Sequence, residues 1–123
     1  MKVGFSSMGS SSDSILDPRF GRAAYFVIAD ADSMEFEIIE NTAASAGGAG
    51  ITAGQLMADK GVEAVVTGSV GPNAMDVLKA AGIRIYKGCS ETITENLNRF
   101  KKGALEKIEA TVPQHFGMQG GNR

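Results

Sequence analysis

The chain has 123 residues, of which 43% are hydrophobic, and this size and composition suit one domain with a single core. Charged residues make up 21% and the formal net charge is -2, so the sequence offers no broad basic field for nucleic acid or an anionic membrane. Cys89 is the single cysteine, which excludes an internal disulfide, and no apolar run reaches the roughly 20 residues of a membrane span. We therefore expect a soluble protein of a reducing compartment, the cytoplasm.

Three strands are predicted in the first third of the chain. The first covers residues 2–6 and ends in a polar loop that reaches Asp17. Residues 25–30 are dense in β-formers, and in residues 35–40 apolar and acidic side chains alternate, as in a strand with one wet face. The short turn between these two segments predicts a hairpin.

From residue 51 onward, helices and strands are expected to alternate. Gly61, Gly82 and Gly103 each follow a helical pattern and are placed to end it. The predicted elements are a helix over 51–60, a strand over 62–67, a helix between Pro72 and Gly82, a strand over 83–86 and a helix over 91–102. We assign residues 1–110 to one domain and residues 111–123 to a flexible, glycine-rich C-terminal tail.

This order of elements predicts an α/β domain with a five-stranded mixed sheet. Each strand-helix-strand unit joins parallel strands through a right-handed crossover, and the hairpin adds an antiparallel strand. With strand two antiparallel, the simplest spatial order is 3-2-1-4-5. The direction of the connections then switches between strands one and four, where open α/β sheets bind ligands.

In this arrangement five loops share the ligand-binding edge of the sheet. Helices begin directly after three of them, and helix N-termini present unpaired N–H groups and partial positive charge, which favours an anion. Arg19 and Arg22 would add fixed charge. The candidate binding residues are Ser6, Ser7, Arg22, Gly48, Ala49, Gly50, Gly68, Gly71 and Asn73. The alternative, that the glycines only satisfy turn dihedrals, stays open.

Two residues are candidate metal ligands. Cys89 follows the fifth predicted strand and could supply a soft ligand, and His115 could supply a borderline one from the tail. Their alternatives, a small buried hydrophobe and a solvated tail residue, stay open. With one histidine, the sequence shows no Ser-His-Asp or Cys-His pair, and it lacks the glycine-rich nucleotide motifs. We therefore expect a protein that is not an enzyme.

Several short segments, in the same order along the chain, resemble the dinitrogenase iron-molybdenum cofactor biosynthesis family, which includes NifX and the C-terminal part of NifB. The resemblance spans about residues 1–105, and the combination of Phe-Gly-Arg-Ala with Gly-Pro-Asn-Ala is specific to it. The matching segments are Phe20–Ala23, Glu40–Asn41, Gly48–Gly50, Gly61–Val66, Gly71–Ala74 and Ala81–Tyr86.

The resemblance implies a ribonuclease H-like three-layer fold and noncovalent binding or carrying of an anionic metal-sulfur cluster. The cluster would be the iron-molybdenum cofactor, its iron-sulfur precursor or a related molybdenum-copper sulfide cluster, exchanged with donor or acceptor proteins. Backbone N–H groups at 48–50 and 71–73 would hold it, with Arg22 neutralising charge. Cluster synthesis is not implied, because the radical domain that accompanies this domain in NifB is missing. The alternative function is a metal-free regulatory module that binds a protein partner.

Overall fold

The computed structural model describes residues 1–110, which form one mixed sheet with three helices. The strands lie in the order β3-β2-β1-β4-β5-β6. Their bounds are β1 (Lys2–Ser7), β2 (Tyr25–Asp30), β3 (Phe36–Glu40), β4 (Ala64–Thr67), β5 (Arg84–Lys87) and β6 (Glu106–Lys107).

The predicted order 3-2-1-4-5 is confirmed, with β2 antiparallel to both of its neighbours and β1, β4 and β5 parallel. The prediction of five strands is wrong, because β6 adds an antiparallel strand beside β5. β6 consists of two exposed charged residues, so it has no alternating pattern that the sequence could reveal. The ribonuclease H-like designation stays a prediction.

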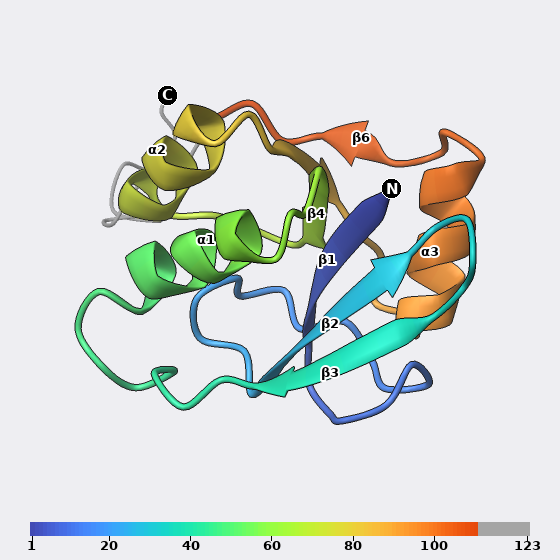
Figure 1. The fold of residues 1–123 in the computed structure, drawn as a ribbon, viewed down its shortest axis with the longest axis horizontal. Helices are drawn as coiled ribbons and strands as arrows, with labels where there is room; N and C mark the ends of the chain where they lie inside the picture. The colour runs from blue at the N-terminus through green and yellow to red at the C-terminus, as the bar shows by residue number, and fades with distance from the viewer. Residues whose placement is uncertain (111–123) are drawn as a thin grey trace, which may run out of the picture.

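The helices cover both faces of the sheet, which gives the molecule three layers (Figure 1). α1 (Ala49–Asp59) and α2 (Pro72–Ala80) lie on one face, and α3 (Ile93–Lys101) lies on the other. The alternation of side chains along the central strands divides the core accordingly: Val65 packs with Met57 and Leu78 toward α1 and α2, whereas Phe5 packs with Leu97 toward α3.

The three glycines predicted to end helices do so, each by the same hydrogen-bond pattern. Gly61, Gly82 and Gly103 have φ values of 71°, 74° and 72°, in the left-handed region that favours glycine. The residue after each glycine donates its N–H to the carbonyl five residues earlier. The distance from the nitrogen to this carbonyl oxygen is 3.1 Å for Val62 and 3.0 Å for Ile83. These are Schellman motifs, and they turn the chain back toward the sheet.

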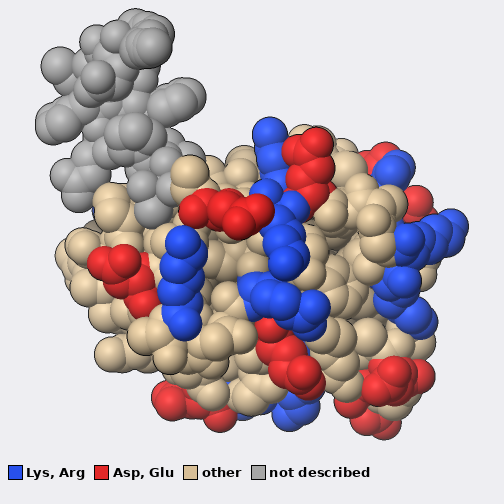
Figure 2. Space-filling view, turned by 90° about the horizontal axis from the view of Figure 1, so that it is seen from above, with Lys and Arg blue, Asp and Glu red and all other residues tan. Residues whose placement is uncertain are grey.

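The tail prediction for residues 111–123 lies outside the described residues. Within residues 1–110, no helix is long and apolar enough to cross a membrane. Figure 2 shows acidic and basic side chains interspersed on the face seen from the β6 side, in agreement with the near-balanced charge of the sequence.

Candidate functional site

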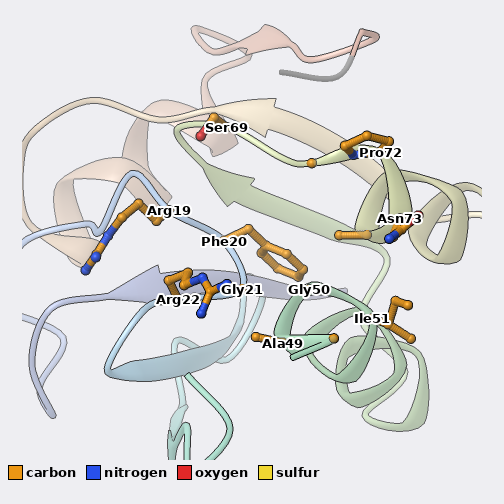
Figure 3. Close-up of a pocket in the computed structure, with 13 residues that line it drawn as sticks. Arg19, Phe20, Gly21, Arg22, Ala49, Gly50, Ile51, Ser69, Pro72 and Asn73 are labelled. Atoms are coloured by element: carbon orange, nitrogen blue, oxygen red, sulfur yellow. The ribbon is translucent and has the colours of Figure 1, made fainter. Parts of the chain in front are cut away.

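A pocket of about 380 Å³ lies at the carboxyl edge of the parallel strands, where the chain connections change direction. Three segments that are far apart in sequence line it: the loop before β2, the start of α1 and the start of α2 (Figure 3). The lining residues are Arg19, Phe20, Gly21, Arg22, Gly48, Ala49, Gly50, Ile51, Ser69, Gly71, Pro72, Asn73 and Ala74.

Close packing of glycines brings the three segments together. A Cβ on Gly21 would lie 2.7 Å from the Cα and the nitrogen of Gly50, so the loop can touch the backbone of α1 only without a side chain. A Cβ on Gly50 would in turn lie 3.1 Å from the Cβ of Ala74 on α2. Phe20 is 2% exposed and anchors the loop in the core beside Phe26, with 5.8 Å between the ring centroids.

Both helices that meet at the pocket begin without a side-chain cap. Gly48 and Gly71 occupy the N-cap positions, and neither first turn contains an acidic residue. The N–H groups of the first turn have no acceptor within their own helix, which leaves donors at Ala49, Gly50 and Asn73. Together with the partial positive charge of two helix ends, these donors make the pocket wall attractive to an anion.

Gly71 has no packing or conformational reason to be a glycine. Its φ of -74° and ψ of 169° are accessible to any residue, and a Cβ added there would meet no atom within 4 Å. It differs in this from Gly21 and Gly50, which the close packing requires. Gly71 therefore keeps a space open at the pocket wall that a side chain would fill.

The two arginines of the pocket differ in whether their guanidinium groups are paired with a carboxylate. Arg19 donates from Nε and Nη2 to the carboxylate of Asp17, at 3.1 and 2.9 Å, and in Figure 3 its side chain points away from Phe20 and Gly50. Arg22 donates from Nη1 to the carbonyl of Ala44 at 3.1 Å and forms no ion pair with any carboxylate of residues 1–110. Arg22 is therefore the cation available to a ligand.

Asp17 holds the start of the loop through Arg19. Its side chain is 2% exposed, and besides the guanidinium it accepts the backbone N–H of Arg19 at 2.9 Å. Burial raises the pKa of the Asp17 carboxyl, but the hydrogen bonds from the Arg19 side chain and backbone outweigh burial and keep this pKa below its usual value. Asp17 is accordingly an ionised structural residue near neutral pH.

Asn41 ties the arginine loop to the segment that precedes α1. Its Nδ2 donates to the carbonyls of Gly21 and Ala23, at 3.1 and 2.8 Å, and its Oδ1 accepts the N–H of Ala43 at 3.2 Å. Sequence reasoning gave Asn41 no role, because its partners lie up to 20 residues away. It fixes the backbone on both sides of Arg22.

Six of the predicted binding residues line this one pocket: Arg22, Gly48, Ala49, Gly50, Gly71 and Asn73. Arg19, also predicted to add charge, lines it too but is paired with Asp17. The remaining lining residues were not among the predicted binding residues, although they adjoin them on the same loop and helix starts: Phe20, Gly21, Ile51, Ser69, Pro72 and Ala74.

The other predicted residues are not part of the pocket. Ser6 is fully buried, with its hydroxyl 2.6 Å from the carbonyl of Asp17 and 2.7 Å from the hydroxyl of Thr67. The hydroxyl of Ser7, also fully buried, donates to the carbonyl of Gly9 at 2.7 Å. A Cβ on Gly68 would lie 2.6 Å from Pro18, so this glycine serves packing.

Cys89, one of the two candidate metal ligands, is not among the residues that line the pocket. The half-buried Cys89 lies on a loop that Asn96 holds, with the N–H of Cys89 2.7 Å from Oδ1 and its carbonyl 3.0 Å from Nδ2. His115 lies outside the described residues. Across residues 1–110, no group of three or more His, Cys, Asp or Glu side chains is arranged to hold a metal ion.

A family model described as dinitrogenase iron-molybdenum cofactor matches residues 1–103. The chain belongs to this family. The resemblance that the sequence segments indicated is thus confirmed. An uncharacterized protein of Methanocaldococcus jannaschii, MJ0580, is 41% identical to the chain over 98 residues, which are 76% of this chain and 83% of that protein.

Two solved structures extend the similarity to the whole fold. The apo form of the orange protein from Desulfovibrio gigas has a TM-score of 0.83 and 37% identity, covering 89% of this chain and 93% of that chain. An NMR structure from Thermotoga, described as a candidate NifB protein, has a TM-score of 0.82 and 37% identity, covering 92% and 97%. Both proteins share the arrangement of sheet and helices found here.

Proposed function

We propose that this chain is a noncatalytic carrier or chaperone of an anionic metal-sulfur cluster, bound in the pocket between the Phe20–Ala23 loop and the N-termini of α1 and α2. The cargo is the iron-molybdenum cofactor, its iron-sulfur precursor or a related molybdenum-copper sulfide cluster. Membership of the dinitrogenase iron-molybdenum cofactor family supports this class of ligand.

The convergence of two uncapped helix ends and one unpaired arginine carries the proposal. The first turns of α1 and α2 contain no acidic residue, and Arg22 has no carboxylate partner within residues 1–110. A volume of about 380 Å³ falls within the range of about 300–1,000 Å³ usual for small-ligand sites. Size and charge thus agree with a compact anion.

The chemistry of binding follows from the donors present. The sulfides of the cluster would accept hydrogen bonds from the N–H groups of Ala49, Gly50 and Asn73, while Arg22 offsets the negative charge. The open space at Gly71 lets the cluster approach the start of α2. A cluster held in this way forms no coordinate bond to a side chain, so only hydrogen bonds and charge contacts must break on release, which suits transfer to an acceptor protein.

The proposal includes a cellular compartment and a class of partner proteins. A reducing compartment, the cytoplasm, would keep both the cluster and the thiol of Cys89 reduced. Donor and acceptor proteins for the cluster are the proposed partners, and cluster exchange with them is a binding equilibrium without a chemical step catalysed by this chain.

Anaerobic reconstitution tests the proposal. The protein, freed of metal, is incubated with iron, sulfide and thiomolybdate, with and without copper, then desalted and assayed for bound metals and visible absorption. We expect a coloured complex with a fixed ratio of metal to protein. A folded protein that stays colourless with these mixtures and with isolated iron-molybdenum cofactor would contradict the carrier function and favour the metal-free interaction module.

A pair of variants locates the site. Arg22→Gln should weaken cluster retention by about tenfold, the effect of removing one charge-assisted contact of about 1.4 kcal/mol. Arg84→Gln is the matched control, because Arg84 is exposed and lies on β5 outside this pocket. Equal retention by the two variants would show that the pocket assignment is wrong.

A further inference from the structure

A second cavity, of about 590 Å³, lies at the opposite end of the parallel strands, on the face that α3 covers. Met1 at the start of β1 and Arg84 at the start of β5 mark this end of the sheet. The cavity shares no lining residue with the pocket described above. The residues that give it its chemistry are Arg84, Tyr86, Phe100, Lys101, Leu105 and Lys107.

The cavity exists because the two faces of the sheet are covered unequally. Two helices cover one face, whereas the nine-residue α3 alone covers the other (Figure 1). Arg84 and Tyr86 are two residues apart on β5, and Lys107 of β6 is the register partner of Tyr86, so all three side chains leave the sheet on one face. The surface between β5, β6 and the end of α3 is left open.

The wall of this cavity is aromatic. The rings of Tyr86 and Phe100 meet edge to face, with 5.2 Å between their centroids and an angle of 81° between their planes. Both side chains, like that of Leu105, are only partly buried and pack against the core cluster on the α3 side. Partly exposed aromatic rings offer a planar ligand a surface to pack against.

The rim of the cavity is cationic. Arg84, Lys101 and Lys107 are exposed, and none forms an ion pair with a carboxylate of residues 1–110. Asp32 also lines the cavity, but its carboxylate accepts a hydrogen bond from the amino group of Met1 at 3.1 Å and is thus paired with a positive charge. Three unpaired cations at one cavity stand out in a chain whose formal net charge is -2.

Two of these cations have a local explanation in the fold. Lys101 lies in the last turn of α3, where a positive charge offsets the helix dipole. Lys107 lies on the edge strand β6, where a charged side chain opposes pairing with another chain, whereas Arg84 lies on β5, where neither a helix end nor a sheet edge explains it. The guanidinium of Arg84 donates from Nη1 to the Tyr86 hydroxyl at 3.4 Å, and its other donors have no hydrogen-bond partner among residues 1–110. Figure 2 shows basic side chains across the face seen from the β6 side, with acidic side chains beside them.

We propose that this cavity is a second ligand site, which binds a small organic anion composed of a planar aromatic body and a phosphate or carboxylate group. The aromatic body packs on Tyr86 and Phe100, and the anionic group contacts Arg84 and Lys107. A guanidinium beside an ammonium suits a doubly charged phosphate better than a carboxylate. The site is independent of the cluster pocket, because it lies at the other end of the sheet.

Four matched probes separate the two parts of this proposal: 1-naphthyl phosphate, 1-naphthoate, 1-naphthol and inorganic phosphate. Each is titrated into the isotope-labelled, full-length protein, and amide shifts are followed by NMR. We expect 1-naphthyl phosphate to bind most tightly and to shift the amides of β5, β6 and the end of α3. Removing the charge, as in 1-naphthol, or the ring, as in inorganic phosphate, should each weaken binding by about tenfold. Binding should also weaken in about 1 M salt, where the Debye length is about 3 Å.

A double variant with a matched control completes the test. The double variant Arg84→Gln, Lys107→Gln should weaken the binding of 1-naphthyl phosphate by about tenfold or more. Lys87→Gln with Lys102→Gln removes the same charge from neighbouring positions outside the cavity and should leave binding unchanged. The proposal is overturned if 1-naphthol binds as tightly as 1-naphthyl phosphate, if both double variants bind alike, if the shifts map to the cluster pocket, or if neither naphthyl anion binds.

Discussion

The three helices within residues 1–110 begin in two different ways. At α3, the hydroxyl of Thr92 accepts the N–H of Glu95 at 3.0 Å, and Glu95 places a carboxylate in the first turn. At α1 and α2 the N-cap residues are Gly48 and Gly71, with no side-chain cap and no acid in the first turn. Glycine in place of a side-chain cap costs a few tenths of a kcal/mol, so two of the three helices in residues 1–110 do without a common, if modest, source of stability.

The difference follows the position of each helix end. Both uncapped ends lie on the pocket, whereas Thr92 is not among the residues that line it. Steric reasons do not forbid a cap at α2, because Gly71 has an extended backbone and open space around it. The two helix ends without a side-chain cap are thus the ones that line the pocket, as the proposed anion site requires.

The largest expected effect comes from breaking the contact between the loop and α1. Gly21→Ala places a Cβ 2.7 Å from backbone atoms of Gly50 and should lower the free energy of unfolding by about 2 kcal/mol. Urea unfolding measures this change. Gly71→Ala, which meets no atom within 4 Å, should stay within about 0.5 kcal/mol of the unchanged protein. Similar losses in both variants would contradict the packing role of Gly21.

A smaller effect is expected from the buried carboxylate beside the pocket. Asp17→Asn removes the ion pair with Arg19, which is 63% exposed, so the loss at neutral pH should be about 1 kcal/mol. Because folding lowers the pKa of Asp17, its carboxylate stabilises the fold above the unfolded-state value near 3.8, and this contribution disappears as the pH falls through the folded-state value.

The pH dependence of urea unfolding checks this sign. Below about pH 5, the stability of the Asn variant should fall less steeply with decreasing pH than that of the unchanged protein. Parallel acid limbs for the two proteins would show that Asp17 is not preferentially ionised in the folded chain.

Removing the cap of α3 makes this helix resemble the other two. Thr92→Ala should cost about 1 kcal/mol in urea unfolding, because the N–H of Glu95 loses its acceptor. Cluster retention by the folded variant should be unchanged, since Thr92 lies outside the pocket. If a folded Thr92→Ala protein lost the cluster, the N-terminus of α3 would also contribute to cluster binding, which would contradict the proposal that only the N-termini of α1 and α2 do so.

Much of the fold could be predicted from local patterns. The alternation of strands and helices, with right-handed crossovers, gave the strand order, and Gly61, Gly82 and Gly103 marked the helix ends correctly. β6 escaped prediction because two charged residues acquire their strand character only by pairing with β5. Local sequence predicts elements well when their own pattern defines them.

The site was predictable only to the level of its loops. The sequence located the helix starts at the pocket, but it could not show that Ser6 pairs with Thr67, that Asp17 engages Arg19, or that Asn96 holds the loop of Cys89. These contacts decide which polar residues are structural and which face the pocket. The Ser6–Thr67 contact joins residues 61 positions apart, the Asn96–Cys89 contact depends on how the loop folds back on the start of α3, and the Asp17–Arg19 contact depends on how deeply Asp17 is buried.

One pair of variants tests the central claim most directly. Gly71→Asp gives α2 the carboxylate cap that its backbone accommodates, so stability should rise by about 0.5 kcal/mol while the new charge competes with the cluster for the same donors. Thr92→Asp places a new carboxylate at the N-cap of α3, away from the pocket. In anaerobic reconstitution we predict that Gly71→Asp loses the cluster and Thr92→Asp retains it. Full retention by a folded Gly71→Asp protein would contradict the account.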